Sequence, residues 1–119
     1  MNTRAIGTDK EETACDYLKK NGIKIKERNF RCRIGEIDII GYDGAYLVFF
    51  EIKYRKDTSK GGAAAAVNIK KQYKICRVTD YYRMIHHYPD NMPIRFDVVA
   101  IDGDEITWYK NAFEYHYRS

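Results

Sequence analysis

The sequence has few cysteines and no long apolar run, and each shortage excludes a class of protein. Its three cysteines, Cys15, Cys32 and Cys76, are far apart and form neither a CxxC motif nor a Cys/His spacing. We therefore expect buried free thiols rather than a disulfide framework or a zinc site. No stretch approaches the roughly 18 apolar residues of a membrane helix, and no apolar signal segment is present. These features predict a cytoplasmic protein without a membrane partner.

The sequence also lacks repeats and low-complexity tracts, and it holds only two prolines. Its 119 residues suffice for a single core, so we expect one domain over residues 1–119. Apolar periodicity and turn residues predict helices over 8–21 and 63–87 and strands over 23–33, 35–40, 47–53, 94–101 and 105–109. This order predicts an α/β fold with a mixed central sheet flanked by helices.

Positive charge is spread unevenly along the chain. The formal net charge is +4. Between Lys53 and Arg83, nine Lys or Arg residues stand against two acids, Asp57 and Asp80, so this segment carries +7 and the rest of the chain −3. Such a concentration suits a polyanion substrate, and a solvated basic surface explains it equally well.

Two neighbouring strands carry acids among apolar residues. The first reads Gly35-Glu36-Ile37-Asp38-Ile39-Ile40, and the second reads Leu47-Val48-Phe49-Phe50-Glu51-Ile52-Lys53. Burying an unpaired carboxylate costs several kcal/mol, so Asp38 and Glu51 need a compensating partner. A divalent metal ion is one such partner.

The hairpin between these strands decides whether the two acids meet. With a two-residue turn at Asp43-Gly44, Asp38 lies opposite Phe49 and diagonal to Glu51 on one face of the sheet. Lys53 points to the same face, because side chains alternate along a strand. A register shift of one residue would move Asp38 to the other face.

The first helix offers a third acid. Gly7, Glu11, Ala14 and Leu18 form one stripe at helical spacing, and the other three members are small or apolar. Glu11 is therefore expected on the core side, where it would join the strand acids. The alternative is an acid stabilised by the helix macrodipole near the N-terminus.

The acids belong to a longer ordered set of residues. The set runs through Gly7-x3-Glu11-x2-Ala14-x2-Tyr17-Leu18, Arg28-Asn29-Phe30-Arg31-Cys32-Arg33, Gly35-Glu36-Ile37-Asp38, Phe50-Glu51-Ile52-Lys53-Tyr54-Arg55, Ala66-Val67, Lys71-Gln72 and Arg95-Phe96-Asp97. At these spacings the chain resembles the YraN-like family of small bacterial proteins, which has a PD-(D/E)xK nuclease-type core and is considered related to archaeal Holliday junction resolvases. The resemblance implies a restriction-endonuclease-like αβββαβ core. The chain departs from the family pattern at Lys10, Tyr54 and Ala65.

The resemblance also implies a function and a cofactor. It implies a metal-dependent DNA endonuclease that hydrolyses phosphodiester bonds, with branched or junction DNA as a candidate substrate. Mg²⁺ or Mn²⁺ would be bound by Asp38, Glu51 and the carbonyl group of Ile52. The alternative is a nucleic-acid-binding protein on a nuclease scaffold without efficient catalysis. A homodimer is compatible with the resemblance to resolvases, which make two symmetric cuts.

Three further residues receive catalytic roles from the resemblance. Lys53 would stabilise developing charge or orient the attacking water, Glu11 would support the metal, and Gln72 is the polar residue of the following helix. The basic residues expected to contact phosphates are Arg31, Arg33, Arg55, Lys56, Lys60, Lys70, Lys71 and Lys74.

Three other polar positions have competing interpretations. Glu36 could join the site or form a salt bridge with Arg31 or Arg33. For Asp97, a structural pair with Arg95 or another base is favoured over a metal role. The pair His86-His87 lies near a helix end, where capping carbonyl groups is favoured over metal binding.

Overall fold

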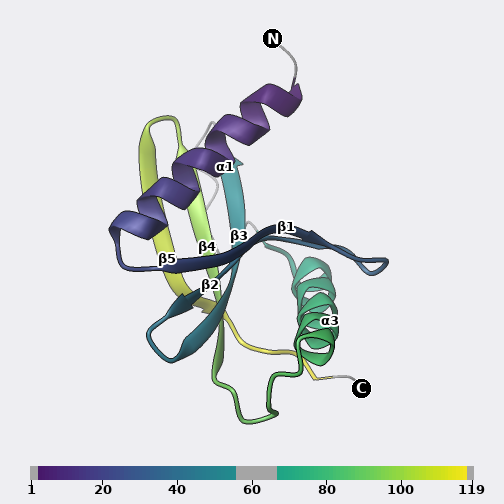
Figure 1. Cartoon of the computed structure of the whole chain (residues 1–119). Coiled ribbons are helices and arrows are strands. Elements are labelled where there is room, and N and C mark those ends of the chain that lie inside the picture. The colour runs from purple at the N-terminus through teal and green to yellow at the C-terminus, as the bar shows by residue number, and fades with distance from the viewer. Residues whose placement is uncertain (1–2, 56–66, 118–119) are drawn as a thin grey trace.

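Two helices cover opposite faces of a mixed sheet in the described part of the computed structural model (Figure 1). The structure describes residues 3–55 and 67–117, with side chains at 10–54 and 67–117. The elements in chain order are α1 (Thr3–Lys20), β1 (Lys24–Arg31), β2 (Glu36–Asp43), β3 (Tyr46–Arg55), α3 (Ile69–Ile85), β4 (Ile94–Asp102) and β5 (Glu105–Phe113). This order confirms the predicted α/β class and is compatible with a restriction-endonuclease-like core.

The strands lie in the sheet in the order in which they occur along the chain, β1-β2-β3-β4-β5. Neighbours are antiparallel except for β3 and β4, which run parallel. A parallel pair needs a long crossover connection, and the segment that contains α3 supplies it. The sheet is therefore mixed, as the sequence predicted.

The β2–β3 hairpin turns one residue later than the sequence predicted. Asp43 pairs with Tyr46, so the turn residues are Gly44 and Ala45. Gly44 has a φ of 60°, which matches a two-residue turn that needs positive φ at its first position. The predicted turn at Asp43-Gly44 is therefore wrong, because the left-handed backbone conformation belongs to the first turn residue.

This different turn changes which residue lies opposite Asp38. Phe49 pairs with Ile40 rather than with Asp38, and the regular pairing ends at Ile39 and Phe50, the residues next to Asp38 and Glu51 in their strands. The register differs from the expected one by an even number of residues, so Asp38 keeps its predicted face. The two acids come closer than the diagonal arrangement implied.

The second helix begins later than predicted. The chain is not helical at Val67 and Asn68, and α3 starts at Ile69. The side chain of Asn68 accepts a 2.9 Å hydrogen bond from the amide of Lys71, which is the usual geometry of a helix N-cap. The predicted start at Ala63 lies outside the described residues, and the predicted end at His87 is two residues too late.

Each face of the sheet carries its own core. The α3 side contains Leu47, Phe49 and Tyr82 among its buried residues, whereas the α1 side contains Leu18 and Phe50. Phe49 and Phe50 point to opposite faces because side chains alternate along a strand. By the same alternation, Glu51 and Lys53 follow Phe49 to the α3 side.

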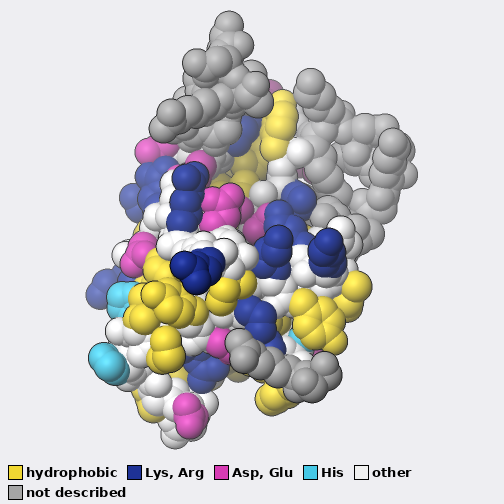
Figure 2. All heavy atoms as spheres, turned by 90° about the vertical axis from the view of Figure 1, so that its right-hand side faces the viewer, with side chains coloured by type: hydrophobic (Ala, Val, Ile, Leu, Met, Phe, Trp, Pro, Cys, Tyr) yellow, Lys and Arg dark blue, Asp and Glu magenta, His cyan; other side chains and the backbone are white. Residues whose placement is uncertain are grey.

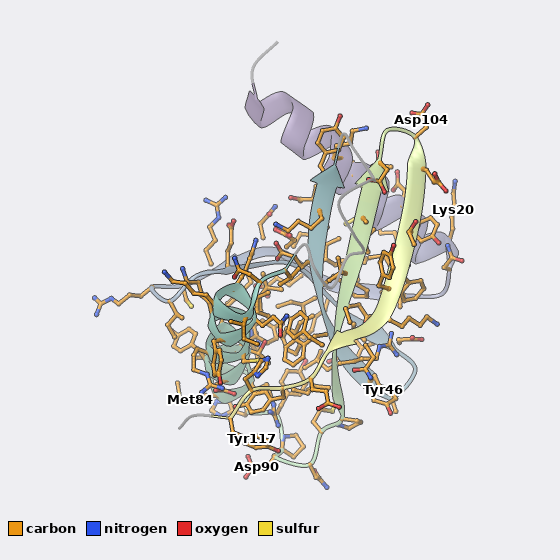
Figure 3. The ribbon with its side chains drawn as sticks, turned by 180° about the vertical axis from the view of Figure 1, so that it is seen from behind. Lys20, Tyr46, Met84, Asp90, Asp104 and Tyr117 are labelled. Atoms are coloured by element: carbon orange, nitrogen blue, oxygen red, sulfur yellow. The ribbon has the colours of Figure 1, made fainter. Side chains whose placement is uncertain are left out.

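The C-terminal segment returns across the end of the sheet to α3 (Figures 1 and 3). Tyr117 lies toward this end of the molecule, and Asp104, in the β4–β5 turn, lies at the other end (Figure 3). Arg77 holds the segment by donating to the carbonyl group of His116 and to the hydroxyl group of Tyr115. These contacts attach the C-terminal segment to one side of α3.

The cysteines and the helices were the subject of two predictions from the sequence. Cys15, Cys32 and Cys76 are free thiols, and Cys15 and Cys76 are buried while Cys32 is partly buried. Of the helices that the structure describes, none is long and apolar enough to cross a membrane.

Candidate functional site

Two carboxylates from adjacent strands meet on the α3 face of the sheet. The Asp38 carboxylate of β2 accepts a 2.8 Å hydrogen bond from the backbone amide of Ile52 in β3. Glu51, the residue before Ile52, has a side chain that is only 8% exposed. The sheet therefore places two acids side by side where its core ends, as the sequence predicted.

The acids open onto a pocket of about 220 Å³ between the sheet and α3. Its lining residues are Gly35, Glu36, Asp38, Glu51, Lys71, Lys74 and Ile75. Figure 2 views the face of the molecule on which α3 lies, and acidic side chains gather there with lysine and arginine side chains around them. The pocket thus combines an acidic floor with a basic rim.

The pKa of Asp38 is raised to about 7. Burial is the largest cause, and the nearby charge of Glu51 raises the pKa further. The hydrogen bond from the Ile52 amide and the charge of Lys71 act in the opposite direction but do not compensate. Strong perturbation of an acid by burial and a like charge is typical of functional sites.

Lys71 of α3 forms an ion pair with Glu51. Burial alone would lower the pKa of Lys71, but the hydrogen bond and the charge of Glu51 outweigh burial and raise it. The side chain of Lys71 is 42% exposed, whereas that of Glu51 is 8% exposed, so Lys71 lies between the carboxylate and the solvent. Lys71 is therefore the direct electrostatic partner of Glu51.

Lys53 and Ile52 lie beside the two acids in β3. Lys53 is partly buried on the same face as Glu51, and it lies close enough to Lys71 to influence the pKa of that residue. The Ile52 amide faces β2, and in an extended strand the carbonyl group of a residue faces the same neighbouring strand as its amide. The Ile52 carbonyl group is thus directed toward β2.

Glu11 does not join the two strand acids. Its carboxylate accepts a 2.8 Å hydrogen bond from Arg28 and another of 2.8 Å from Asn29. The cause is the sheet itself, because α1 packs on one face and the strand acids point to the other. The predicted grouping of Glu11 with Asp38 and Glu51 is therefore wrong, and Glu11 instead links α1 to β1.

Gln72 has structural partners on the outer side of the pocket. Its side-chain nitrogen donates a 2.8 Å hydrogen bond to the Val67 carbonyl group, and its oxygen lies 2.8 Å from Nε2 of His116. The ring of His116 stacks on Tyr73 at 4.6 Å. Gln72 therefore links the start of α3 to the C-terminal segment, a role that the sequence did not indicate.

The candidate phosphate contacts fall into three groups. Lys71 and Lys74 line the pocket from α3, and Lys70 lies at the start of that helix. Arg31 and Arg33 lie around the β1–β2 turn. Arg31 forms an exposed ion pair with Glu36 at 3.0 Å, which confirms the salt-bridge interpretation of Glu36. Lys56, Lys60 and the side chain of Arg55 lie outside the described residues.

Asp97 is a structural residue. It is fully buried and accepts hydrogen bonds from Arg95, from the Trp108 ring nitrogen at 2.8 Å and from the Asn111 amide at 2.9 Å. The favoured pairing with Arg95 is confirmed.

His86 packs its ring against that of Tyr82, with the ring centroids 4.2 Å apart.

The acid pair fits a hard divalent cation. Among the described side chains, which are those of residues 10–54 and 67–117, no three from His, Cys, Asp or Glu lie close enough together to hold a metal ion. Mg²⁺ needs only one or two carboxylates, since waters and substrate phosphates complete its octahedral shell. The raised pKa of Asp38 shows that a second negative charge is costly in this pocket, and a cation would remove that cost.

Sequence reasoning missed the ion pair between Lys71 and Glu51. Lys71 was predicted only as one of several candidate phosphate contacts, and no local pattern distinguishes it from Lys70 or Lys74. The distinction arises only from the angular position of Lys71 on α3, which the N-cap at Asn68 sets.

The fold and the site define an α/β protein with paired carboxylates and flanking lysines at the end of a mixed sheet. The chain belongs to the uncharacterised protein family UPF0102, whose profile matches residues 10–101. A UPF0102 protein of Lachnoclostridium phytofermentans is 44% identical over 114 residues, which cover 96% of this chain and 97% of the relative. A second relative, from Legionella pneumophila, is 43% identical over 114 residues, covering 94% and 97%. A third, from Colwellia psychrerythraea, is 46% identical over 110 residues, covering 87% and 84%.

This family membership confirms the YraN-like part of the resemblance. The names of these relatives state no activity, substrate or cofactor. The nuclease core, the relation to resolvases, the metal and the dimer stay predictions.

Proposed function

We propose that this protein is a metal-dependent DNA endonuclease that hydrolyses phosphodiester bonds at the pocket between β2, β3 and α3. One observation carries the proposal: two acids meet in a part of the core where an apolar pair would be more stable. Asp38 has a pKa of about 7 there, and Glu51 is 8% exposed beside it. Proteins retain such costly acids mainly where chemistry needs them.

The residues around the acids suit phosphodiester hydrolysis. A bound divalent ion would supply an activated water and stabilise negative charge on the phosphate. Asp38, Glu51 and the Ile52 carbonyl group would bind that ion, with the Ile52 amide holding the Asp38 carboxylate in place. Lys53 supplies a positive charge on the same face, where it can stabilise charge that develops on a phosphate oxygen.

The surroundings of the pocket suit a polyanion. Lys74 is exposed at the pocket, Lys70 is exposed at the start of α3, and Arg31 and Arg33 are exposed at the β1–β2 turn. Phosphate contacts of this kind supply most of the affinity of a sequence-independent DNA-binding protein. This pattern supports binding to the backbone of DNA, and branched DNA belongs among the candidate substrates.

The direct test incubates the full chain with Mg²⁺ or Mn²⁺ and linear, nicked, flapped and four-way-junction DNA. We expect cleavage of at least one substrate that depends on the metal. Glu51→Gln should reduce the rate at least about 100-fold, because it removes a charged ligand of the divalent ion that would stabilise the transition state. Glu105→Gln, at an exposed position in β5, is the matched control and should cleave at the rate of the unaltered protein.

Each alternative outcome has a definite meaning. Cleavage that survives in Glu51→Gln would refute the assignment of the site. Binding of DNA without cleavage by the unaltered protein would favour the alternative, a nucleic-acid-binding protein on a nuclease scaffold. In that case, affinity should still fall steeply with salt, and a flat salt response would argue against any nucleic-acid partner.

A further inference from the structure

We propose that Lys71 is a resident counter-ion of the metal site, paired with Glu51 in the metal-free protein and released toward the DNA backbone when a divalent cation takes the carboxylate. The inference rests on the proposed function and adds a positioning role that is specific to this lysine. It assigns to Lys71 two alternative anionic partners, one for each state of the site.

The first argument is the ion pair itself. The Glu51 carboxylate is almost fully buried, and the ammonium group of Lys71 is its direct partner from α3. A buried carboxylate without a partner is strongly destabilising. Lys71 therefore supplies the compensating charge that the metal-free protein needs at this position.

The second argument is that Lys71 and a divalent ion compete for the same oxygens. A carboxylate that is 8% exposed has little surface left for a second cation. The ammonium group and the metal would also repel each other, because two like charges a few ångströms apart in a poorly hydrated pocket interact strongly. Occupation of Glu51 by a metal therefore requires that Lys71 moves away.

The third argument is that Lys71 has somewhere to go. Its backbone is fixed by the Asn68 N-cap, while its side chain is 42% exposed at the pocket rim. Rotation of the long aliphatic stem would take the ammonium group toward Lys74, which lines the same pocket. Two lysines at one rim repel each other unless a polyanion lies across them, so the released lysine favours DNA binding.

The test measures Mn²⁺ binding to the full chain by electron paramagnetic resonance of the free ion. We expect Lys71→Met to lower the dissociation constant about tenfold, because a competing cation is gone; a tenfold change corresponds to about 1.4 kcal/mol. Lys20→Met, at an exposed position in the last turn of α1 on the opposite face of the sheet, is the matched control and should bind Mn²⁺ like the unaltered protein. Lys71→Arg keeps the competing charge and should also match the unaltered protein.

Folding and DNA binding provide independent measurements. Thermal unfolding with and without Mn²⁺ should show a larger metal-induced stabilisation of Lys71→Met than of the unaltered protein, because only the variant lacks a partner for Glu51. With a nuclease-resistant phosphorothioate duplex, Lys71→Met should lose about threefold in affinity when Mn²⁺ is present and remain unchanged in EDTA, since Lys71 contacts phosphate only after release.

The outcomes separate this inference from the proposed function. Equal or weaker Mn²⁺ binding by Lys71→Met, with normal binding by the unaltered protein, overturns the counter-ion role and leaves the metal site intact. An equal loss of DNA affinity with and without Mn²⁺ overturns the release step. If neither the unaltered protein nor Lys71→Met binds Mn²⁺, the proposed metal site and this inference fail together.

Discussion

The backbone amide of Ile52 donates a 2.8 Å hydrogen bond to the carboxylate of Asp38, one step beyond the last β2–β3 backbone pair. A side chain thus continues the link between the strands at the point where the regular pairing ends. The bond fixes the carboxylate of Asp38 beside Glu51 and stabilises its charged form. Burial and the charge of Glu51 act against that form and prevail.

The first prediction concerns the pH dependence of stability. The pKa of Asp38 is raised to about 7 in the folded protein, mainly by burial, from an ordinary value of about 3.9 in the unfolded chain. The folded state therefore binds the proton more tightly, so its stabilising effect is complete below about pH 4 and is lost as the pH rises to about 7. We expect Asp38 to contribute a decrease of at most about 4 kcal/mol in the free energy of unfolding across this window.

Urea unfolding in EDTA at pH 5 and pH 8 measures this slope. Asp38→Asn should remove it and should be more stable than the unaltered protein at pH 8. Asp16→Asn, at an exposed position on α1, is the control and should keep the slope. A slope that persists in Asp38→Asn would assign the titration to another group.

The second prediction separates a structural acid from the acids of the site. Asp97→Asn should lower the free energy of unfolding by about 3 kcal/mol, because it leaves the buried guanidinium group of Arg95 without its main partner. Asp43→Asn should cost less, about 1 kcal/mol, because Asp43 is more exposed and Arg95 keeps Asp97. Chemical denaturation measures both values.

The folded Asp97→Asn protein should bind Mn²⁺ with unchanged affinity. Weaker Mn²⁺ binding at a temperature where the variant is fully folded would show that Asp97 acts at the metal site after all.

The third prediction concerns two glycines with different neighbours. A Cβ atom at Gly41 would lie 2.8 Å from the backbone oxygen of Lys24, whereas at Gly35 it would lie 3.1 Å from the flexible side chain of Lys74. Gly41→Ala should therefore destabilise the protein by about 2 kcal/mol, because β1 must shift, and Gly35→Ala by less than about 1 kcal/mol. Thermal and urea unfolding check the order, and a larger cost at Gly35 would contradict the close packing of β1 on β2.

The fourth prediction tests whether Gln72 is catalytic or structural. Its hydrogen bonds go to Val67 and His116, so Gln72→Ala and His116→Ala should have the same small effect on cleavage, about threefold or less. Both variants should make the C-terminal segment more sensitive to proteolysis.

For comparison, Lys53→Ala should reduce kcat/KM at least about 100-fold, because it removes the positive charge proposed to stabilise the transition state.

A large loss in Gln72→Ala together with normal cleavage by His116→Ala would contradict the structural role. It would place the Gln72 amide in contact with the substrate, as the resemblance implied.

Much of the fold could be predicted because its signals are local. The order of helices and strands follows from apolar periodicity, and the Asp-Gly pair marked the β2–β3 hairpin. The turn itself came out one residue later, since only Gly44 adopts positive φ. The helix boundaries are harder to predict from sequence. The apolar Ala66-Val67 segment before the N-cap at Asn68 continues the apolar pattern of the helix, so the pattern does not mark where the helix begins.

The candidate site was predicted in part for the same reason. Alternation along β2 and β3 put Asp38, Glu51 and Lys53 on one face, and the even register difference preserved that result. The prediction that Glu11 joins these acids was wrong. A helical stripe shows that a residue faces inward, but it does not show which face of the sheet the helix covers.

The sequence by itself therefore determined the family, the element order and the pairing of two acids across one hairpin. These depend on residue spacing within short segments. Only the tertiary structure decided which polar partners meet. It forms the ion pairs of Arg28 with Glu11 and of Lys71 with Glu51, and the hydrogen bond between His116 and Gln72. These partners lie at least 17 residues apart along the chain, and charged and polar groups pair with whichever partner the packing of helices on the sheet brings within reach.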